Sequence, residues 1–125
     1  MKFLLDTNIV IWAMREDERL GPVWQSILVD PENELYLSAA SVWEMQIKSC
    51  LGKLKLPDGF DEGLVRFGFR ELAVRWEHAR ATAQLPFIHK DPFDRLLLAQ
   101  AISEGLVLIS GDAKLRAYGD FVTVV

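Results

Sequence analysis

The stretch Lys2-Phe3-Leu4-Leu5-Asp6-Thr7-Asn8 decides the fold that we predict for this chain. Its aliphatic residues form an unbroken apolar run, which is typical of a strand buried on both faces of a parallel sheet. The run stops at Asp6, and a short apolar helix that Thr7 or Asn8 could cap follows it. Open α/β sheets bind ligands beyond the carboxyl ends of their strands. We therefore expect Asp6 to belong to a site, and we expect further acids at the same edge.

The rest of the chain repeats this alternation. Apolar periodicity and the positions of glycine and proline predict strands near residues 2–5, 35–38, 71–74, 106–109 and 121–125. Helices are predicted over about 9–14, 22–29, 41–51, 58–67, 76–85, 92–102 and 113–118. The predicted fold class is therefore α/β, with one mainly parallel sheet covered by helices on both faces, in a single domain of residues 1–125.

The composition favours a packed protein of a reducing compartment. Half of the 125 residues are hydrophobic, so a core can form without disulfide or metal staples. The single cysteine, Cys50, cannot form an internal disulfide and is interpreted as a packing residue. The N-terminus begins as a strand rather than as a signal segment, and no apolar run approaches the roughly 20 residues of a membrane span. We expect a cytoplasmic protein without membrane association.

The charge balance restricts the class of function. The chain has 18 acidic residues against 14 basic ones, a formal net charge of -4. A passive nucleic-acid binder usually carries a basic face, so this class is disfavoured. An enzyme that acts on nucleic acid remains compatible, because acids that bind a divalent metal ion produce the same excess.

Four acids are candidates for such a site. Asp6 and Asp112 each follow an apolar strand, while Glu44 and Asp94 stand near the starts of helices. Like charges at close range raise one another's pKa, so four carboxylates brought together need a counter-charge. Mg²⁺, with Mn²⁺ as a substitute, prefers oxygen ligands and also binds phosphate oxygens. The pattern therefore predicts hydrolysis of a phosphodiester by a metal-activated water.

Each acid also has a structural interpretation. Capping a helix could be the whole role of Asp6. An unpaired acid beside an apolar strand is costly, however, so a functional role is favoured. Glu44 follows Ser41 by three residues, which is the spacing of a capping box, and spacing alone favours that role. Asp91 and Asp94 both suit a helix N-terminus, and their spacing does not choose between them.

Other residues near the motifs have ordinary explanations as well. Asp112 is explained equally well as a turn or cap acid. A loop or surface position is favoured for His89, and His78 has no acid or cysteine at a ligand-like spacing. Four tryptophans are assigned to the core or an interface rather than to base stacking: Trp12, Trp24, Trp43 and Trp76. Three lysines could meet phosphates, although a solvated face is favoured for them: Lys48, Lys53 and Lys55.

Four segments together resemble the PIN-domain ribonucleases, and among them the VapC-type toxins of bacterial type II toxin–antitoxin pairs. They are Leu4-Leu5-Asp6-Thr7-Asn8, Ser38-Ala39-Ala40-Ser41-Val42-Trp43-Glu44, His89-Lys90-Asp91-Pro92-Phe93-Asp94-Arg95-Leu96 with Ala99-Gln100-Ala101, and Leu108-Ile109-Ser110-Gly111-Asp112. Each segment alone is a weak motif. Their order, their spacing and the chain length make the resemblance specific, and it spans the whole chain.

The resemblance implies which residues form the site. It implies that four acids serve as catalytic residues and line a Mg²⁺ site: Asp6, Glu44, Asp94 and Asp112. Asp94 is thereby chosen over Asp91, which becomes a neighbour that tunes the site or holds the loop. Thr7 or Asn8, together with Ser110, would orient carboxylates or the attacking water.

The resemblance also implies a three-layer α/β/α fold, a homodimer, and a small VapB-like antitoxin whose C-terminal segment blocks the acidic groove. The implied activity is Mg²⁺-dependent hydrolysis of RNA. An aspartate-dependent phosphatase of the haloacid-dehalogenase type is the alternative enzyme, although it normally needs a second acid where this chain has Asn8. A non-catalytic interaction domain is the third reading, and four acids at one edge disfavour it.

Overall fold

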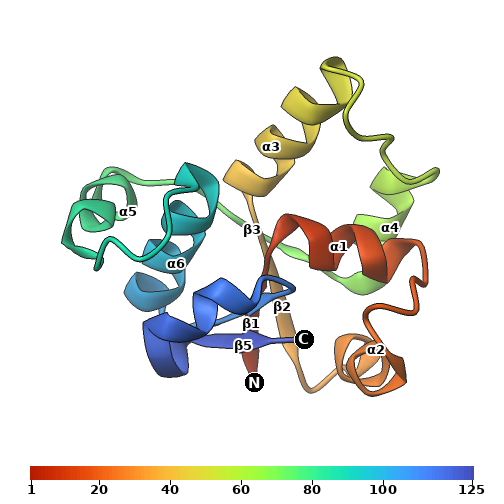
Figure 1. Cartoon of the computed structure of the whole chain (residues 1–125). Helices are drawn as coiled ribbons and strands as arrows, with labels where there is room; N and C mark the ends of the chain where they lie inside the picture. The colour runs from red at the N-terminus through yellow and green to blue at the C-terminus, as the bar shows by residue number, and fades with distance from the viewer.

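The computed structural model describes residues 1–125 and contains one five-stranded sheet in the order β3-β2-β1-β4-β5 (Figure 1). All neighbouring strands are parallel. The strands are β1 (Lys2–Leu5), β2 (Glu34–Ser38), β3 (Arg70–Leu72), β4 (Val107–Ser110) and β5 (Val122–Val124). The predicted α/β class is confirmed.

Helices connect the strands and begin where the sequence favours them. They are α1 (Thr7–Met14), α2 (Pro22–Val29), α3 (Ala39–Cys50), α4 (Phe60–Phe67), α5 (Trp76–Ala81) and α6 (Pro92–Glu104), with the 3₁₀ helices η1 (Thr82–Gln84) and η2 (Ala113–Phe121). Proline occupies the start of α2 and α6, where its missing N–H costs nothing. No helix combines the length and the apolar character that crossing a bilayer requires.

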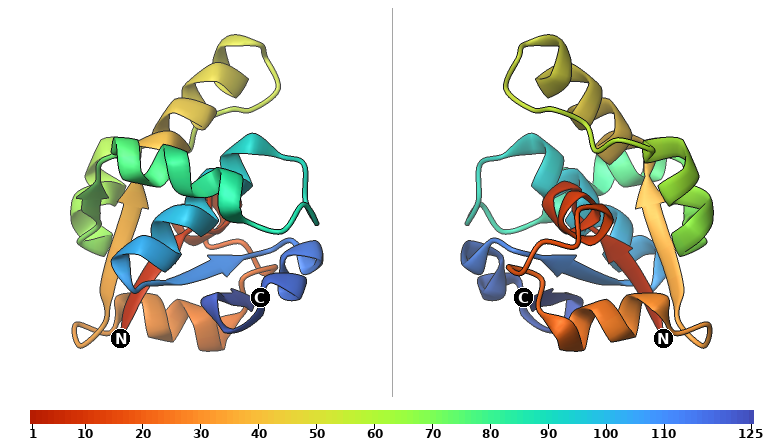
Figure 2. Two further views of the ribbon diagram at one scale, coloured as in Figure 1. Left: turned by 90° about the vertical axis from the view of Figure 1, so that its left-hand side faces the viewer. Right: turned by 90° about the vertical axis from the view of Figure 1, so that its right-hand side faces the viewer.

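The sheet separates two apolar cores. Along β1, Phe3 and Leu5 belong to one core and Leu4 to the other, as the alternation of side chains in a strand requires. Ile9 of α1 packs in the first core and Leu97 of α6 in the second. Figures 1 and 2 show α1, α2 and α4 over one face of the sheet and α5 and α6 over the other. The predicted three-layer α/β/α arrangement is confirmed.

The strand order reverses beside β1. The chain lays β2 and β3 on one side of β1 and then places β4 and β5 on the other side. Such a reversal leaves a crevice at the carboxyl ends of the two central strands, where open α/β sheets bind ligands. Leu5 pairs with Ile109, and the N–H of Asp6 donates to the carbonyl of Ile109 at 3.0 Å. The residues that follow β1 and β4 therefore lie side by side.

The first helix begins one residue earlier than a Thr7 or Asn8 cap would allow. The Asp6 carboxylate accepts the N–H of Ile9 at 3.0 Å, so Asp6 itself is the cap of α1. The prediction that Thr7 or Asn8 caps this helix is wrong. Asp6 thus has a structural role in addition to any role in a site.

The third helix begins at Ala39 rather than near Ser41. Ser38 is its cap, and the Ser38 hydroxyl accepts the N–H of Ala40 at 3.1 Å. Ser41 is buried, and its hydroxyl has no hydrogen-bond partner. The predicted capping box of Ser41 and Glu44 does not form, so the Glu44 carboxylate is available for other contacts.

Two of the four tryptophans and the single cysteine lie on the surface, so of the two places predicted for the tryptophans only an interface suits Trp43 and Trp76. Trp76 is 90% exposed and Trp43 is 64% exposed, and Cys50 is exposed as well, so its assignment as a packing residue is wrong. Trp43 and Cys50 belong to α3, which projects from the body of the protein (Figure 2). The buried stripe of α3 consists instead of residues spaced by three to four positions: Ala40, Ser41, Glu44 and Met45. Trp12 and Trp24 pack against the first core, as predicted.

Candidate metal centre

Asp6 stands at the carboxyl end of β1, where it is only 6% exposed and makes no ion pair. Burial raises the pKa of the Asp6 carboxyl above its ordinary value. Hydrogen bonds from the Ser110 hydroxyl and from the N–H groups of Ile9 and Gly111 oppose this rise, and the negative charge of Glu44 adds to it. A buried acid that faces another acid is unfavourable unless a counter-charge is supplied.

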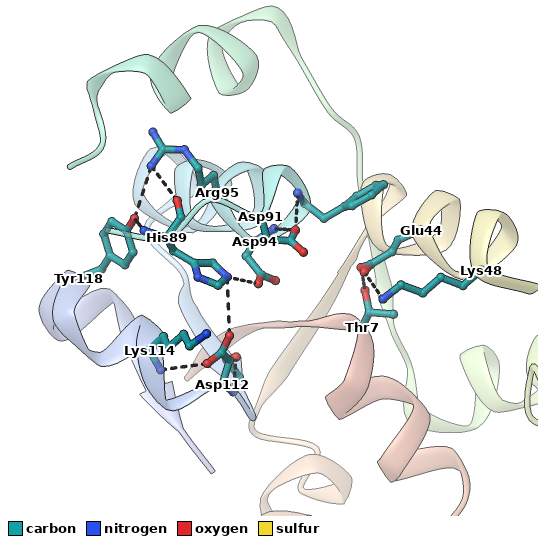
Figure 3. A network of polar contacts seen from close by, with 12 residues as sticks. Thr7, Glu44, Lys48, His89, Asp91, Asp94, Arg95, Asp112, Lys114 and Tyr118 are labelled. Carbon is teal, nitrogen blue, oxygen red and sulfur yellow. Dashed lines mark hydrogen bonds and ion pairs between the residues drawn. The ribbon is translucent and has the colours of Figure 1, made fainter. Parts of the chain in front are cut away.

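Glu44 approaches Asp6 from α3 and is 7% exposed. The Thr7 hydroxyl donates to its Oε1 at 2.5 Å, and the Lys48 ammonium lies 2.7 Å from its Oε2 (Figure 3). The ion pair with Glu44 raises the pKa of Lys48, and the charges of Asp91 and Asp94 contribute to the rise. Lys48 therefore lies beside the acids, and its side chain is also 45% exposed, which agrees with the solvated face predicted for it.

The structure gives Asp91 and Asp94 different roles. Asp91 caps α6, since its Oδ1 accepts the N–H of Phe93 at 2.8 Å and the N–H of Asp94 at 3.1 Å. The Asp94 carboxylate is directed instead toward His89, whose Nε2 lies 2.7 Å from Oδ2 (Figure 3). Asp91 thus satisfies the end of the helix and leaves the Asp94 carboxylate free to face the other acids.

The environment of Asp94 disfavours its ionised form. Burial raises the pKa of the Asp94 carboxyl from 3.8 to about 6. The hydrogen bond with His89 lowers this pKa, while the negative charges of Asp91 and Asp6 raise it. Asp94 therefore lies within electrostatic reach of Asp6, just as Asp6 lies within reach of Glu44. Acids from β1, α3 and α6 meet at one edge of the sheet.

Asp112 follows β4, and its side chain is 38% exposed. Its Oδ1 accepts the N–H of Lys114 at 2.9 Å and thereby caps η2, while its own N–H donates to the Ser110 hydroxyl at 3.0 Å. The second carboxylate oxygen, Oδ2, lies 3.6 Å from Nε2 of His89 (Figure 3). Asp112 therefore combines the cap role with an oxygen that faces the other acids.

His89 lies in a loop, as predicted, but its ring is not on the surface. The side chain is 13% exposed and touches both Asp94 and Asp112. The predicted loop position is therefore confirmed, while the side chain turns inward toward the acids. The separation of five residues between His89 and Asp94 was the only sign in the sequence that the two side chains could meet. Contact with Asp112 depends on how the loop before α6 packs against the residues after β4.

The supporting residues separate into two groups. Thr7 is buried and bonded to Glu44, and Ser110 is fully buried beside Asp6 and Asp112. Asn8 is exposed on α1 and makes no side-chain hydrogen bond. Only Thr7 and Ser110 are brought to the acidic edge.

The acidic donor set fits a hard divalent cation. It presents carboxylate oxygens from four elements: Asp6, Glu44, Asp94 and Asp112. One ligand atom from each of His89, Asp94 and Asp112 lies within 4.8 Å of the others. Mg²⁺ and Mn²⁺ take such oxygen ligands, and their charge would offset the burial and, to a lesser extent, the repulsion that raise the pKa of Asp6 and Asp94.

A second group of acids and histidine does not fit a cation. Glu77, His78 and Glu104 lie close together, with His78 completely buried. The N–H of Arg75 donates to Nδ1 of His78 at 3.0 Å, so Nε2 carries the proton and donates to Glu104 at 2.8 Å. Both ring nitrogens are used, and His78 joins α5 to α6. The sequence did not indicate the contact between His78 and Glu104, because Glu104 belongs to a different helix, α6.

Gly111, between β4 and Asp112, packs closely against the ring of Trp12. A Cβ atom at this position would lie 2.7 Å from Cη2 and 2.9 Å from Cζ3 of Trp12, whose ring packs against the first core. We expect Gly111→Ala to lower the free energy of unfolding by about 1–3 kcal/mol, the usual cost of overpacking. Urea denaturation measures this change. The same substitution in a Trp12→Leu background should cost much less, and an equal cost in both backgrounds would contradict the steric explanation.

Comparisons with known proteins agree with this fold. The family model described as PIN domain matches residues 3–120. No curated protein matches the chain significantly. The structure is similar to VapBC2 from Rickettsia felis bound to a DNA fragment from its promoter (TM-score 0.70, 16% identity, 100% of this chain and 98% of that chain).

Two further solved structures are similar. One is DNA-bound VapBC from Salmonella typhimurium (TM-score 0.68, 19% identity, 100% and 97% coverage), and the other is a toxin–antitoxin complex from Klebsiella pneumoniae (TM-score 0.63, 22% identity, 97% and 95% coverage). At such identities the likeness concerns the fold. The family model covers nearly the whole chain, and the chain therefore belongs to the PIN domain family.

Proposed function

We propose that this protein is a divalent-metal-dependent endoribonuclease, and that it acts as the toxin of a toxin–antitoxin pair. The observation that carries the proposal is the meeting of Asp6, Glu44 and Asp94 at the carboxyl edge of a PIN sheet, with the pKa of Asp6 and of Asp94 raised. Ionised carboxylates that are buried close together are unfavourable on their own, and they suit a site where a cation and a phosphodiester bind together.

Each residue at the acidic edge has a definite task in this proposal. Asp6 and Asp94 hold the metal ion, and Asp112 contributes its free Oδ2. Thr7 fixes Glu44 by donating to Oε1, so the Glu44 carboxylate does not turn away. Lys48 stabilises Glu44 and adds a positive charge at the edge that the phosphate approaches. When bound, a divalent ion supplies Lewis acidity and lowers the pKa of a coordinated water.

RNA is the proposed substrate, and a VapB-like antitoxin is the proposed partner. Both proposals rest on the resemblance of the sequence motifs to VapC-type toxins and on the likeness of the fold to chains from VapBC and toxin–antitoxin structures. A homodimer is proposed from the resemblance, and a cytoplasmic location is proposed from the single cysteine. The antitoxin would inhibit by covering the acidic edge of the sheet, because it would exclude the phosphodiester from the four carboxylates.

Chelation of metal ions tests the activity. We expect the purified protein to cleave a single-stranded RNA in Mg²⁺ or Mn²⁺ and to lose all cleavage in excess EDTA, with recovery when Mg²⁺ is restored. A fluorescently labelled oligonucleotide resolved on a denaturing gel measures the products. A DNA oligonucleotide of the same sequence is the matched substrate control. RNA cleavage that persists in EDTA and in a chelator-treated buffer would overturn the metal dependence.

A further inference from the structure

The loop that carries His89 is held by two side chains from other elements. Arg95 of α6 donates from Nη2 to the carbonyl of Thr82 at 2.7 Å and from Nη1 to the carbonyl of Pro86 at 3.0 Å. Tyr118 of η2 donates to the carbonyl of Pro86 at 2.9 Å. It also accepts the N–H of His89 at 3.0 Å, and Figure 3 shows Tyr118 beside His89 and Arg95. The loop backbone is therefore held on both sides, and the hydrogen bond with Asp94 fixes the direction of the His89 ring.

The held ring places one nitrogen between two of the proposed metal ligands. Nε2 of His89 lies 2.7 Å from Oδ2 of Asp94 and 3.6 Å from Oδ2 of Asp112. Donor atoms that share an octahedral ion at bond lengths of about 2.1 Å lie about 3.0 Å apart at right angles. The His89 distances fall on either side of this separation. The three donors also lie within 4.8 Å of one another, so small shifts of these side chains would bring all of them onto one ion.

We propose that His89 completes the metal centre as its one nitrogen ligand, through Nε2, and that it makes the site favour Mn²⁺ over Mg²⁺. Imidazole suits transition-metal ions, while Mg²⁺ prefers oxygen ligands throughout. A site made of carboxylates alone favours Mn²⁺ over Mg²⁺ less strongly than a site that includes an imidazole nitrogen. The inference rests on the metal centre of the proposed function, and it adds a ligand and a selectivity to that centre.

Two substitutions separate a ligand from a residue that only positions Asp94. His89→Gln keeps a group that can hydrogen bond to Asp94 but replaces the imidazole nitrogen by an amide. His89→Ala removes both. Lys90→Gln is the matched control, since Lys90 is the exposed neighbour of His89 in the same loop. Circular dichroism spectra establish that each variant is folded.

Pulsed electron paramagnetic resonance of bound Mn²⁺ reads the ligand directly. We expect nitrogen modulation in the wild-type protein and in Lys90→Gln, and its loss in both His89 variants. Calorimetric titration with Mn²⁺ and with Mg²⁺ reads the selectivity. The ratio of Mn²⁺ to Mg²⁺ affinity should fall by at least about tenfold in both His89 variants, because even an outer partner of a metal ligand is worth roughly 10- to 100-fold in affinity.

The outcomes separate this inference from the proposed function. Absence of nitrogen modulation in the wild-type protein would overturn the inference, whether or not RNA is cleaved. A loss of affinity that is equal for the two metals in the His89 variants would also overturn it, since that is the signature of a residue that only positions Asp94. Nitrogen modulation in a protein that cleaves no RNA would support the inference and remove the proposed function.

Discussion

Asp6→Asn is expected to reduce RNA cleavage by more than about 100-fold while leaving the protein folded. The lower bound follows from outer hydrogen-bonding partners of metal ligands, whose loss already costs roughly 10- to 100-fold in affinity or activity. Asparagine keeps the size of the side chain and one carbonyl oxygen, and it is as good a helix cap as aspartate. The hydrogen bond that α1 receives at Ile9 is therefore retained, whereas the charge that would hold a cation is removed.

The choice of asparagine matters for Asp6 because the residue has two roles. Asp6→Ala would remove the cap of α1 as well as the charge, at a cost of about 1 kcal/mol in stability, and so would mix the two effects. Asp120→Asn is the matched control, since Asp120 is exposed on η2 and makes no side-chain contact with the acidic edge. Initial rates of RNA cleavage and urea denaturation should be measured on all three variants. Wild-type cleavage by folded Asp6→Asn would remove Asp6 from the site.

Asp94→Asn is expected to stabilise the metal-free protein at pH 7 by up to about 3 kcal/mol. The folded state raises the pKa of Asp94 from 3.8 to about 6, and each unit of pKa corresponds to about 1.4 kcal/mol. At pH 7 the group is ionised in both states, and the folded state bears the cost. The asparagine oxygen can still accept a hydrogen bond from His89, so the variant loses the charge and little else.

The pH dependence of this effect has a definite sign. Because the folded protein binds the Asp94 proton more tightly than the unfolded chain does, protonation stabilises the fold. That contribution is fully present below pH 3.8 and is lost as the pH rises through about 6. The stability difference between Asp94→Asn and wild type should therefore be largest near pH 7 and shrink toward pH 4. Urea denaturation in EDTA across this range measures it, and a difference that does not change with pH would contradict the explanation.

Added Mn²⁺ should reverse the order of stability at pH 7. A ligand that binds only the folded state stabilises it, and the wild-type carboxylates offer the better site. Asp94→Asn, which stabilises the metal-free protein, should therefore abolish the increase in the free energy of unfolding that Mn²⁺ gives to the wild-type protein. Stability and activity oppose each other at Asp94, as is common where acids are held together for function.

The sheet and the acids at its carboxyl edge could be predicted because their signals are local. The apolar runs before Asp6 and Asp112 indicated two buried strands without any knowledge of the neighbouring strands. The acid that interrupts each run marked where the strand ends. The order of the strands was not predictable in this way, since it depends on how β4 packs beside β1. Asp6 and Asp112 were therefore placed on one edge, but their adjacency came only from the structure.

The remaining details of the site depend on contacts between distant segments. Ser41 and Glu44 have the spacing of a capping box, yet Ser38 competes successfully for the cap because strand β2 ends there. His89 faces Asp112 only because Arg95 and Tyr118 fasten its loop. No local pattern reports such contacts. The choice of Asp94 over Asp91 came from the resemblance, and the cap geometry at Asp91 agrees with it.

The central claim is that the acidic edge binds a divalent metal ion. The most direct measurement is the anomalous scattering of Mn²⁺ in crystals of the wild-type protein grown with the ion. We predict a peak among the carboxylates of Asp6, Asp94 and Asp112, with Nε2 of His89 in its coordination sphere. A fully resolved map with no peak at this edge, or with its only peak at Glu77 and Glu104, would contradict the account.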